Sequence, residues 1–474
     1  MPDAYDAVIV GSGPNGLAAA IEIARAGRSV LVLEAADTIG GGTRTEELTL
    51  PGFRHDVCSA IHPMGIASPF FRTLPLEAHG LQWVHPEIQL AHPLDDGSAI
   101  VVLRSVEATA DNLGVDAKRY RALMAPFYEN AEALIDGFLS PLLRIPRHPF
   151  VMARFGMSGI RPADKLLHAK FEGERARALL AGNAAHAMLP LTSPLTGAFA
   201  LVYNVFAHHV GWPAALGGSQ AIADALASYL RSLGGVIETG RHIDSVDELP
   251  TSRVVLFDVS PDSLIHIAGK ELPASYVSKL KRFRYGAGVF KIDWALDGPI
   301  PWRSRDCARA GCLHLGGTIE EIAASEQTVA DGKHPDKPWV IVAQQSVFDH
   351  TRAPSGKQTA WAYAHVPSGS TVDITDNVER QLERFAPGFR DVVLARSVRT
   401  AADIAAYNPN YVGGDISSGA ATFRQMIGRP VLSTHPHATP NERLFLCSSS
   451  TPPGPGVHGM CGYFAAHAAL KRLR

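Results

Sequence analysis

The sequence predicts an α/β protein whose N-terminal part is built on a parallel sheet. An apolar strand pattern at Ala7–Val10 precedes a glycine-rich turn, a helix pattern at Leu17–Ala26 and a second strand pattern at Val30–Leu33. A helix followed by a strand pattern recurs at 219–243, and another strand pattern follows at 253–259. The length of 474 residues suits two or three domains rather than a single core.

Composition and charge exclude several classes of function. The net charge is −2 and charged residues make up 19% of the chain, so no basic face for nucleic acid is expected. The five cysteines are scattered, which favours reduced thiols over a disulfide framework. Cys307 and Cys312 lack a second pair at ligand spacing, so we expect no metal site. The first strand begins near Asp6, which leaves no room for a signal peptide and predicts a cytoplasmic protein.

One long stretch, 178–223, contains no Asp, Glu, Lys or Arg. Pro190, Pro194 and Gly197 interrupt its apolar run, which argues against a membrane-spanning helix. Two interpretations remain open, a buried core and the wall of an apolar substrate cavity, and a mixture of both is favoured.

The N-terminal turn carries the pattern G-x-G-x-x-G. Gly11 permits a tight turn, Gly13 lets a pyrophosphate approach the backbone, and Gly16 lets the helix pack closely on the strand. Glu34 ends the second strand eighteen positions after Gly16, where its carboxylate can accept hydrogen bonds from ribose hydroxyls. The ordered pattern predicts a dinucleotide site, and the acid disfavours the 2′-phosphate of NADP.

A second glycine cluster follows at 40–42, with Arg44 two residues later. Its backbone can wrap a pyrophosphate, and the guanidinium of Arg44 can offset the phosphate charge. At this point the dinucleotide could be NAD or FAD.

The fingerprint, Glu34 and the sequence GGGTRT (40–45) together resemble the flavoprotein superfamily of amine oxidases and phytoene desaturases, in which the dinucleotide is FAD. Further segments extend the likeness over nearly the whole chain: 49–64, 211–226, 334–367, 383–393 and 407–420. They resemble the phytoene desaturase-related branch that contains the pyridine-nucleotide-disulphide oxidoreductase domain proteins of type 2.

The resemblance implies a Rossmann-like FAD-binding domain of the glutathione reductase type, built from discontinuous segments, with an inserted α+β substrate domain. The FAD-binding segments are expected at 1–66, 214–262 and 426–474. The substrate domain is expected at 67–213 and 263–425.

The closing stretch CSSSTPPGPGVHGMCGYFAAHAAL (447–470) reads as a rigid turn that feeds a helix N-terminus. In the family this segment passes beneath the isoalloxazine ring. The resemblance implies that amides at Val457–Met460 stabilise the negative charge of the reduced flavin. Relatives usually carry Gly near the position of Ser448, and this chain has three serines there. Ser448 could bond the ribityl chain or could mark looser flavin binding.

Residue by residue, the resemblance implies a set of cofactor-binding positions: Gly11, Gly13, Pro14, Asn15, Gly16, Glu34, Ala35, Gly41, Gly42, Arg44, Ile243, Ser448, Val457, His458, Gly459 and Met460. The family residue at the position of Ile243 touches the adenine through its backbone. Histidine suits proton transfer near neutral pH, and the catalytic candidates are His458, His209 and His62. The neighbouring His208, Trp212, Trp361, Tyr363 and His365 are candidates for substrate contact.

The chemistry expected is transfer of hydride from an apolar, polyene, isoprenoid or lipid-like molecule to flavin N5, with oxygen or a quinone as electron acceptor. A cysteine pair and a second nucleotide fingerprint, which disulfide reductases need, are missing: the segment 285–293 lacks the third glycine. Three alternatives stay open: the reverse saturation reaction, an amine oxidase, and a flavin-bearing regulatory or assembly protein. Val457 and His458 stand where amine oxidases tend to place an aromatic residue.

The run 140–162 is apolar, contains four arginines and has no acid. It reads either as a basic surface over a helix pair or as a patch that touches a membrane peripherally. A homo-oligomer is compatible with the sequence.

Overall fold

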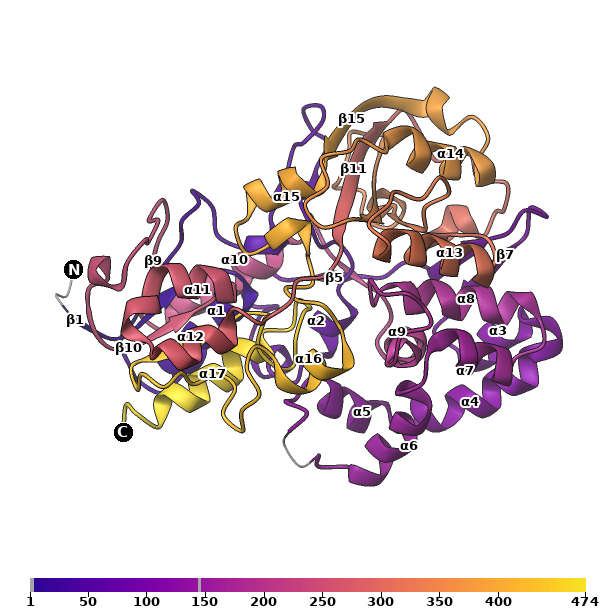
Figure 1. The fold of residues 1–474 in the computed structure, drawn as a ribbon. Helices are drawn as coiled ribbons and strands as arrows, with labels where there is room; N and C mark the ends of the chain where they lie inside the picture. Colours follow the sequence, from indigo (N-terminus) through magenta and orange to yellow (C-terminus); the bar gives the residue numbers. More distant parts are fainter. Residues whose placement is uncertain (1–3, 144–145) are drawn as a thin grey trace.

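The computed structural model describes residues 4–143 and 146–474, which form two sheets with helices packed around them (Figure 1). Both termini lie on the lobe that holds the first sheet. That sheet has five parallel strands in the order β16-β10-β1-β2-β9. Its strands are β1 (Ala4–Val10), β2 (Val30–Leu33), β9 (Val236–Glu238), β10 (Thr251–Phe257) and β16 (Leu444–Leu446).

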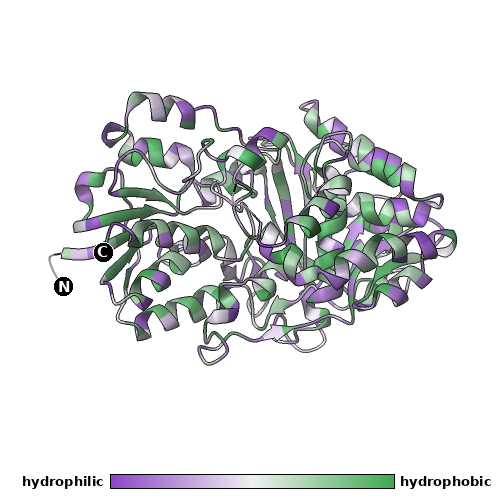
Figure 2. Ribbon diagram, turned by 90° about the horizontal axis from the view of Figure 1, so that it is seen from below, coloured by the Kyte–Doolittle hydropathy of each residue, from purple (hydrophilic) through white to green (hydrophobic). Residues whose placement is uncertain are grey.

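Helices cover both faces of this sheet because its strands are apolar on both sides. Ala7, Ile9 and Val32 pack against one helix layer, whereas Val8 and Leu31 pack against the other. The first layer consists of α1 (Pro14–Arg25), α10 (Gln220–Ser232) and α17 (Met460–Leu470). The second layer consists of α11 (Pro261–Ala268) and α12 (Ala274–Leu280). The hydropathy colouring of Figure 2 shows the strands as largely hydrophobic.

The second sheet has seven strands in the order β15-β11-β14-β13-β12-β6-β7, all antiparallel except the β12–β6 pair. Its strands are β6 (Ile88–Pro93), β7 (Ala99–Val102), β11 (Gly288–Leu296), β12 (Ala310–Leu315), β13 (Val340–Ala343), β14 (Gln358–Val366) and β15 (Val393–Arg399). Four short strands form two further pairs: β3 (Thr45–Glu46) with β4 (His55–Asp56), and β5 (Trp83–Val84) with β8 (Ala214–Ala215).

A group of helices packs beside the second sheet and forms one apolar core with it. These helices are α3 (Val106–Asp111), α4 (Ala117–Glu129), α5 (Ala131–Phe138), α6 (Pro149–Gly159), α7 (Ala163–Lys170), α8 (Glu174–Ala185), α9 (Thr196–His209) and α13 (Ile319–Ala330). The remaining helices are α2 (Pro63–Ala67), α14 (Thr375–Phe385), α15 (Ala401–Tyr407) and α16 (Phe423–Gly428).

The α/β class and the Rossmann-like parallel sheet are as the sequence predicts. Strand β2 occupies the predicted residues, and α1 begins three residues before the predicted start because Pro14 fits the first helical turn. The first sheet takes its strands from 4–33, 236–257 and 444–446. The domain bounds given above remain predictions. Within the described residues, no helix combines the length and the apolar character that crossing a membrane requires.

Helix α17 brings the two ends of the chain into backbone contact. A Cβ atom at Gly462 would lie 1.8 Å from the carbonyl oxygen of Asn15, at the start of α1. Asn15 Nδ2 also donates to Ser449 Oγ at 3.2 Å. Only a glycine at 462 allows this approach, and it fixes the closing segment against the N-terminal turn.

We predict that Gly462→Ala destabilises the protein by about 2 kcal/mol or more, because the methyl group would push two backbone segments apart. Urea denaturation followed by circular dichroism measures the change. Gly298→Ala is the matched control, since a Cβ atom there has no heavy atom within 4 Å. Equal stabilities of the two variants would contradict the close contact.

Candidate functional site

A cavity of about 1320 Å³ runs from the carboxyl edge of the five-stranded sheet to the helices beside the second sheet. Its first part is lined by the N-terminal turn, the residues after β2 and β10, and the closing segment. Its second part is lined by residues of α5, α6, α9, β12 and β14. A nucleotide site and an apolar chamber are therefore parts of one space.

The glycine turn has the close packing that the sequence predicts. Gly11 has φ +102°, a backbone conformation that favours glycine. A Cβ atom at Gly16 would lie 2.1 Å from the Gly11 carbonyl oxygen, so α1 rests directly on the turn. A Cβ atom at Gly13 would lie 2.7 Å from Asp258 Oδ2, so a carboxylate stands beside this backbone.

Glu34 is buried at the end of β2 and its carboxylate is held by the turn itself. Its Oε2 accepts from the Ser12 amide at 2.9 Å and from Ser12 Oγ at 2.6 Å. Its Oε1 accepts from the Ala36 amide at 3.0 Å. These bonds fix the carboxylate at the cavity wall, where the sequence expects a ribose.

Arg44 lies on the cavity wall and is bonded to other residues of the chain. Its Nη2 donates to Glu34 Oε1 at 3.1 Å and to the Thr38 carbonyl at 2.7 Å, and Nη1 donates to Tyr407 Oη at 3.3 Å. The guanidinium neutralises Glu34, because the two side chains meet inside the wall and a buried carboxylate needs a partner. Its role in offsetting pyrophosphate charge remains a prediction.

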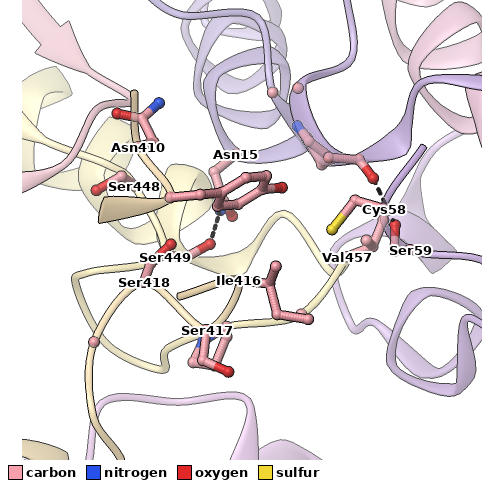
Figure 3. A pocket seen from close by; sticks show the side chains of 18 of the residues that line it. Asn15, Cys58, Ser59, Asn410, Ile416, Ser417, Ser418, Ser448, Ser449 and Val457 are labelled. Carbon is pink, nitrogen blue, oxygen red and sulfur yellow. Dashed lines mark hydrogen bonds between the residues drawn. The ribbon is translucent and has the colours of Figure 1, made fainter. Parts of the chain in front are cut away.

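The closing segment places Val457 and His458 on the cavity wall (Figure 3 labels Val457). His458 is buried, and its Nδ1 accepts from the Met460 amide at 3.0 Å. Burial lowers the pKa of His458 to about 4, so the ring is neutral and carries its proton on Nε2. His458 is therefore a donor rather than a ready base, and the amide of Met460 is already occupied.

Most of the predicted cofactor-binding residues line this cavity: Gly11, Gly13, Pro14, Asn15, Glu34, Ala35, Gly41, Gly42, Arg44, Ile243, Ser448, Val457 and His458. Figure 3 shows Asn15, Ser448 and Ser449 close together, with the bond from Asn15 to Ser449 dashed. Ser448 Oγ lies 2.7 Å from Ser450 Oγ. Gly16, Gly459 and Met460 lie outside the lining; Gly16 instead donates its amide to Asp258 Oδ2 at 2.8 Å.

His62 lies next to the cavity but not on its wall. Its Nε2 is 2.7 Å from Ser219 Oγ, whose own proton goes to the Ser59 carbonyl at 2.6 Å. The imidazole is therefore the donor to the serine, and its buried Nδ1 has no described partner. Burial lowers the pKa of His62 to about 4. This arrangement ties the segment before α2 to the segment before α10.

The position of His209 does not support the catalytic role predicted for it. It stands at the end of α9, away from the cavity lining, and its Nε2 pairs with Glu132 Oε1 at 2.7 Å. Its neighbour His208 is buried and bonds Tyr120 Oη at 2.8 Å. Consecutive helical residues point in different directions, so the pair cannot act together.

Two cavity residues were missed by the sequence interpretation. Asp258 follows β10, and burial raises the pKa of its carboxyl to about 7, with Glu34 adding to the shift. Arg429 is buried and donates to the Ser418 carbonyl at 2.8 Å, with no salt bridge to a described carboxylate. Asp258 could have been predicted, because it stands at the end of a strand pattern. Arg429 could not, because it lies in a stretch without a motif.

The chamber wall is apolar apart from a few neutral polar side chains. Trp212, Trp361 and Tyr363 line it, as expected for substrate-contact candidates, whereas His365 does not. The uncharged stretch contributes nine further lining residues: His186, Ala187, Met188, Leu195, Ala198, Phe199, Val202, Tyr203 and Phe206. Such a space can hold an apolar molecule of several carbons beside a nucleotide.

Comparison with known proteins agrees with this geometry. The model of the NAD(P)-binding Rossmann-like domain family matches residues 9–74. The mouse pyridine nucleotide-disulfide oxidoreductase domain-containing protein 2 is 27% identical, over 99% of this chain and 94% of that protein. The phytoene dehydrogenase of Streptomyces griseus is 24% identical, over 83% of this chain and 78% of that protein.

A solved oxidoreductase from Methanosarcina mazei has the same fold, with a TM-score of 0.67 and 16% identity over 98% of this chain and 99% of that chain.

The raised pKa of Asp258 predicts how the stability of the protein depends on pH. Because its folded-state pKa is raised to about 7 from an ordinary value near 3.8, the folded protein binds the proton more tightly than the unfolded chain. Stability of the nucleotide-free protein should therefore fall as the pH rises from about 4 to 7. Asn retains an acceptor for the Gly16 amide without the charge.

We expect Asp258→Asn to gain stability relative to the wild type, and to gain more at pH 8 than at pH 5. The two gains should differ by an amount on the order of 1–2 kcal/mol. Urea denaturation at both pH values measures it. The exposed Asp247→Asn serves as control. A gain independent of pH would contradict the raised pKa.

Proposed function

We propose that this enzyme, an oxidoreductase related over nearly its full length to the domain-containing protein 2 named above and more distantly to phytoene dehydrogenase, uses FAD to oxidise an apolar small molecule. The reaction is of the dehydrogenase or desaturase type, on a polyene, isoprenoid or lipid-like substrate. The observation that carries the proposal is the single cavity that joins the nucleotide turn to the apolar chamber.

The residues of the first part fit FAD. Glu34, fixed by Ser12, would accept bonds from the ribose, and the close backbones of Gly13 and Gly41 would flank the pyrophosphate. Asn15 Oδ1 is buried without a described partner, and the buried cation of Arg429 lacks an anionic one. Asn15 Oδ1 calls for a hydrogen-bond donor such as a hydroxyl group, and Arg429 calls for an anion, so together they favour a ligand that carries both in this part of the cavity.

Bound FAD would supply the hydride acceptor, its N5 atom. The chain's own residues hold and shield the reactants. The apolar chamber excludes water from the substrate, and the neutral His458, held by the backbone of Gly454 and Pro455 and by the Met460 amide, shapes the junction of the two parts. None of the catalytic candidates His458, His209 and His62 is an exposed side chain without a hydrogen-bond or ion-pair partner. The proposed hydride transfer therefore does not depend on a strong side-chain base.

The alternative of an amine oxidase receives less support. The charged residues on the cavity wall all come from the nucleotide side: Glu34, Arg44, Arg241, Asp244, Asp258, Asp262 and Arg429. None of the charged residues that the structure describes lies in the chamber, so no described carboxylate is available there to bind an ammonium group. A neutral substrate is favoured on this ground.

Oxygen or a quinone is the proposed electron acceptor, and peripheral contact with an anionic membrane is the proposed way of collecting a lipid-like substrate. In α6, Phe150 is 89% exposed and Met157 71% exposed, beside the exposed Arg154. Leu142 and Ile160 are also exposed and line the cavity. Residues 144–145 of the predicted run lie outside the described residues.

Purification tests the proposal directly. Heating the purified protein should release its flavin, and mass spectrometry should identify that flavin as FAD. Anaerobic photoreduction should bleach the bound flavin. Addition of oxygen or a quinone should then restore the colour. Bleaching by a primary amine would support the amine oxidase instead, and a flavin inert to every acceptor would support a regulatory protein. A purified protein without flavin would overturn the proposal.

We predict that Gly13→Val and Glu34→Ala each yield largely colourless protein. Valine would clash with the Asp258 carboxylate and displace the turn that the pyrophosphate needs, and alanine removes the ribose acceptor. The ratio of flavin to protein absorbance measures occupancy. Glu248→Ala, at an exposed position, should retain normal colour. Normal flavin content in both site variants would refute the placement.

We predict that His458→Ala slows flavin reduction by substrate about tenfold or more while FAD stays bound, because the buried ring that orders the closing segment at the junction is lost. Stopped-flow absorbance gives the rate, and the flavin spectrum gives occupancy. His435→Ala, an exposed position, is the control. An unchanged rate would remove His458 from the site.

A further inference from the structure

Three neutral polar side chains meet on the chamber wall without sufficient partners. His186 follows α8, Tyr203 lies on α9 and Tyr363 lies on β14, and all three line the cavity. The rings of His186 and Tyr203 are 4.4 Å apart, and Trp339 connects the group, 5.4 Å from His186 and 6.4 Å from Tyr363. They form one patch, here called the chamber patch.

Hydrogen bonding in the chamber patch is incomplete. No described residue bonds the hydroxyl of Tyr203 or of Tyr363, and both side chains are only partly buried. His186 Nε2 lies 2.9 Å from His314 Nε2, which leaves His186 Nδ1 without a described partner. Polar groups in an apolar cavity cost free energy unless a ligand or water bonds them.

The imidazole pair makes the chamber patch adaptable. One of the two facing Nε2 atoms must carry the proton, and the tautomer of His186 follows from that choice. When His186 donates to His314, its Nδ1 accepts from the cavity. When His314 donates, His186 Nδ1 carries the proton and donates to the cavity. Either a hydroxyl or a carbonyl can therefore be bonded.

The chamber patch is also uncharged. Burial lowers the pKa of His186 to about 3 and raises that of Tyr203 to about 12 and that of Tyr363 well above its ordinary value. Among residues 4–143 and 146–474, no charged side chain lines the chamber. A carboxylate or an ammonium group would lose its hydration there without gaining an opposite charge, so a neutral group is selected.

We propose that the chamber patch binds a neutral oxygen function, a hydroxyl or carbonyl group, carried by an otherwise apolar substrate. This inference rests on the proposed function and narrows its substrate class from hydrocarbons to oxygenated isoprenoid-like or lipid-like molecules. His186, Tyr203 and Tyr363 are the specificity-determining residues, and His314 positions His186.

Four probes with one carbon skeleton test the inference: farnesol, farnesene, farnesoic acid and farnesylamine. Their dissociation constants are measured with the flavin-bound wild type by quenching of tryptophan fluorescence. Farnesol should bind about tenfold more tightly than farnesene, and the acid and the amine should bind more weakly than farnesol.

His186→Phe and the double variant Tyr203→Phe/Tyr363→Phe should lose the preference for farnesol while they keep the affinity for farnesene. Tyr128→Phe, at an exposed position on α4, should behave as wild type. Equal affinity of the wild type for farnesol and farnesene, a preference retained in both variants, or binding of none of the probes would overturn the inference. Flavin content is measured first. A wild type without flavin would contradict the proposed function. A flavin-bound wild type that does not distinguish farnesol from farnesene would contradict this inference alone.

Discussion

The backbone contacts of helix α1 are the constraint on which the site depends. On one side, Gly16 lets α1 rest on the carbonyl of Gly11, and on the other, Gly462 lets α17 touch the carbonyl of Asn15. Side chains at either glycine would separate elements that are held at backbone distance. Because these contacts exist, the N-terminal turn and the closing segment face the same cavity, although more than 400 residues separate them in the chain.

Charge divides that cavity into two environments. All its charged lining residues belong to the nucleotide side, and several are engaged with one another or with the backbone. Glu34 and Arg44 neutralise each other, whereas Arg429 donates to carbonyls and to the Met426 sulfur and has no described carboxylate in a salt bridge. The chamber beyond carries only neutral polar groups. A cofactor with phosphates and a neutral substrate would each find the environment that lowers the cost of leaving water.

The second sheet has a supporting role in this division. Strands β12 to β14 are buried and carry alternating side chains, so one face of β14 presents Trp361 and Tyr363 to the chamber while the other packs into a separate apolar core. The aromatic residues are therefore set by the register of the sheet rather than by a loop. The register thus fixes Tyr363 of the chamber patch, whereas His186 follows α8 and Tyr203 lies on α9.

The sequence alone determined the parts of the protein that depend on neighbouring residues. Hydrophobic period and glycine spacing are local, so strand β2, the turn at Gly11 and the acid Glu34 could all be predicted. Tertiary structure decided everything that depends on a partner far along the chain. Asp258 reached Gly16 across 242 residues, Arg44 reached Tyr407 across 363, and Asn15 reached Ser449 across 434. His209 turned outward to Glu132 because one helical step separates it from the buried face occupied by His208. A residue's type can be read in the sequence, but its protonation and its role follow from which atoms the fold brings to it.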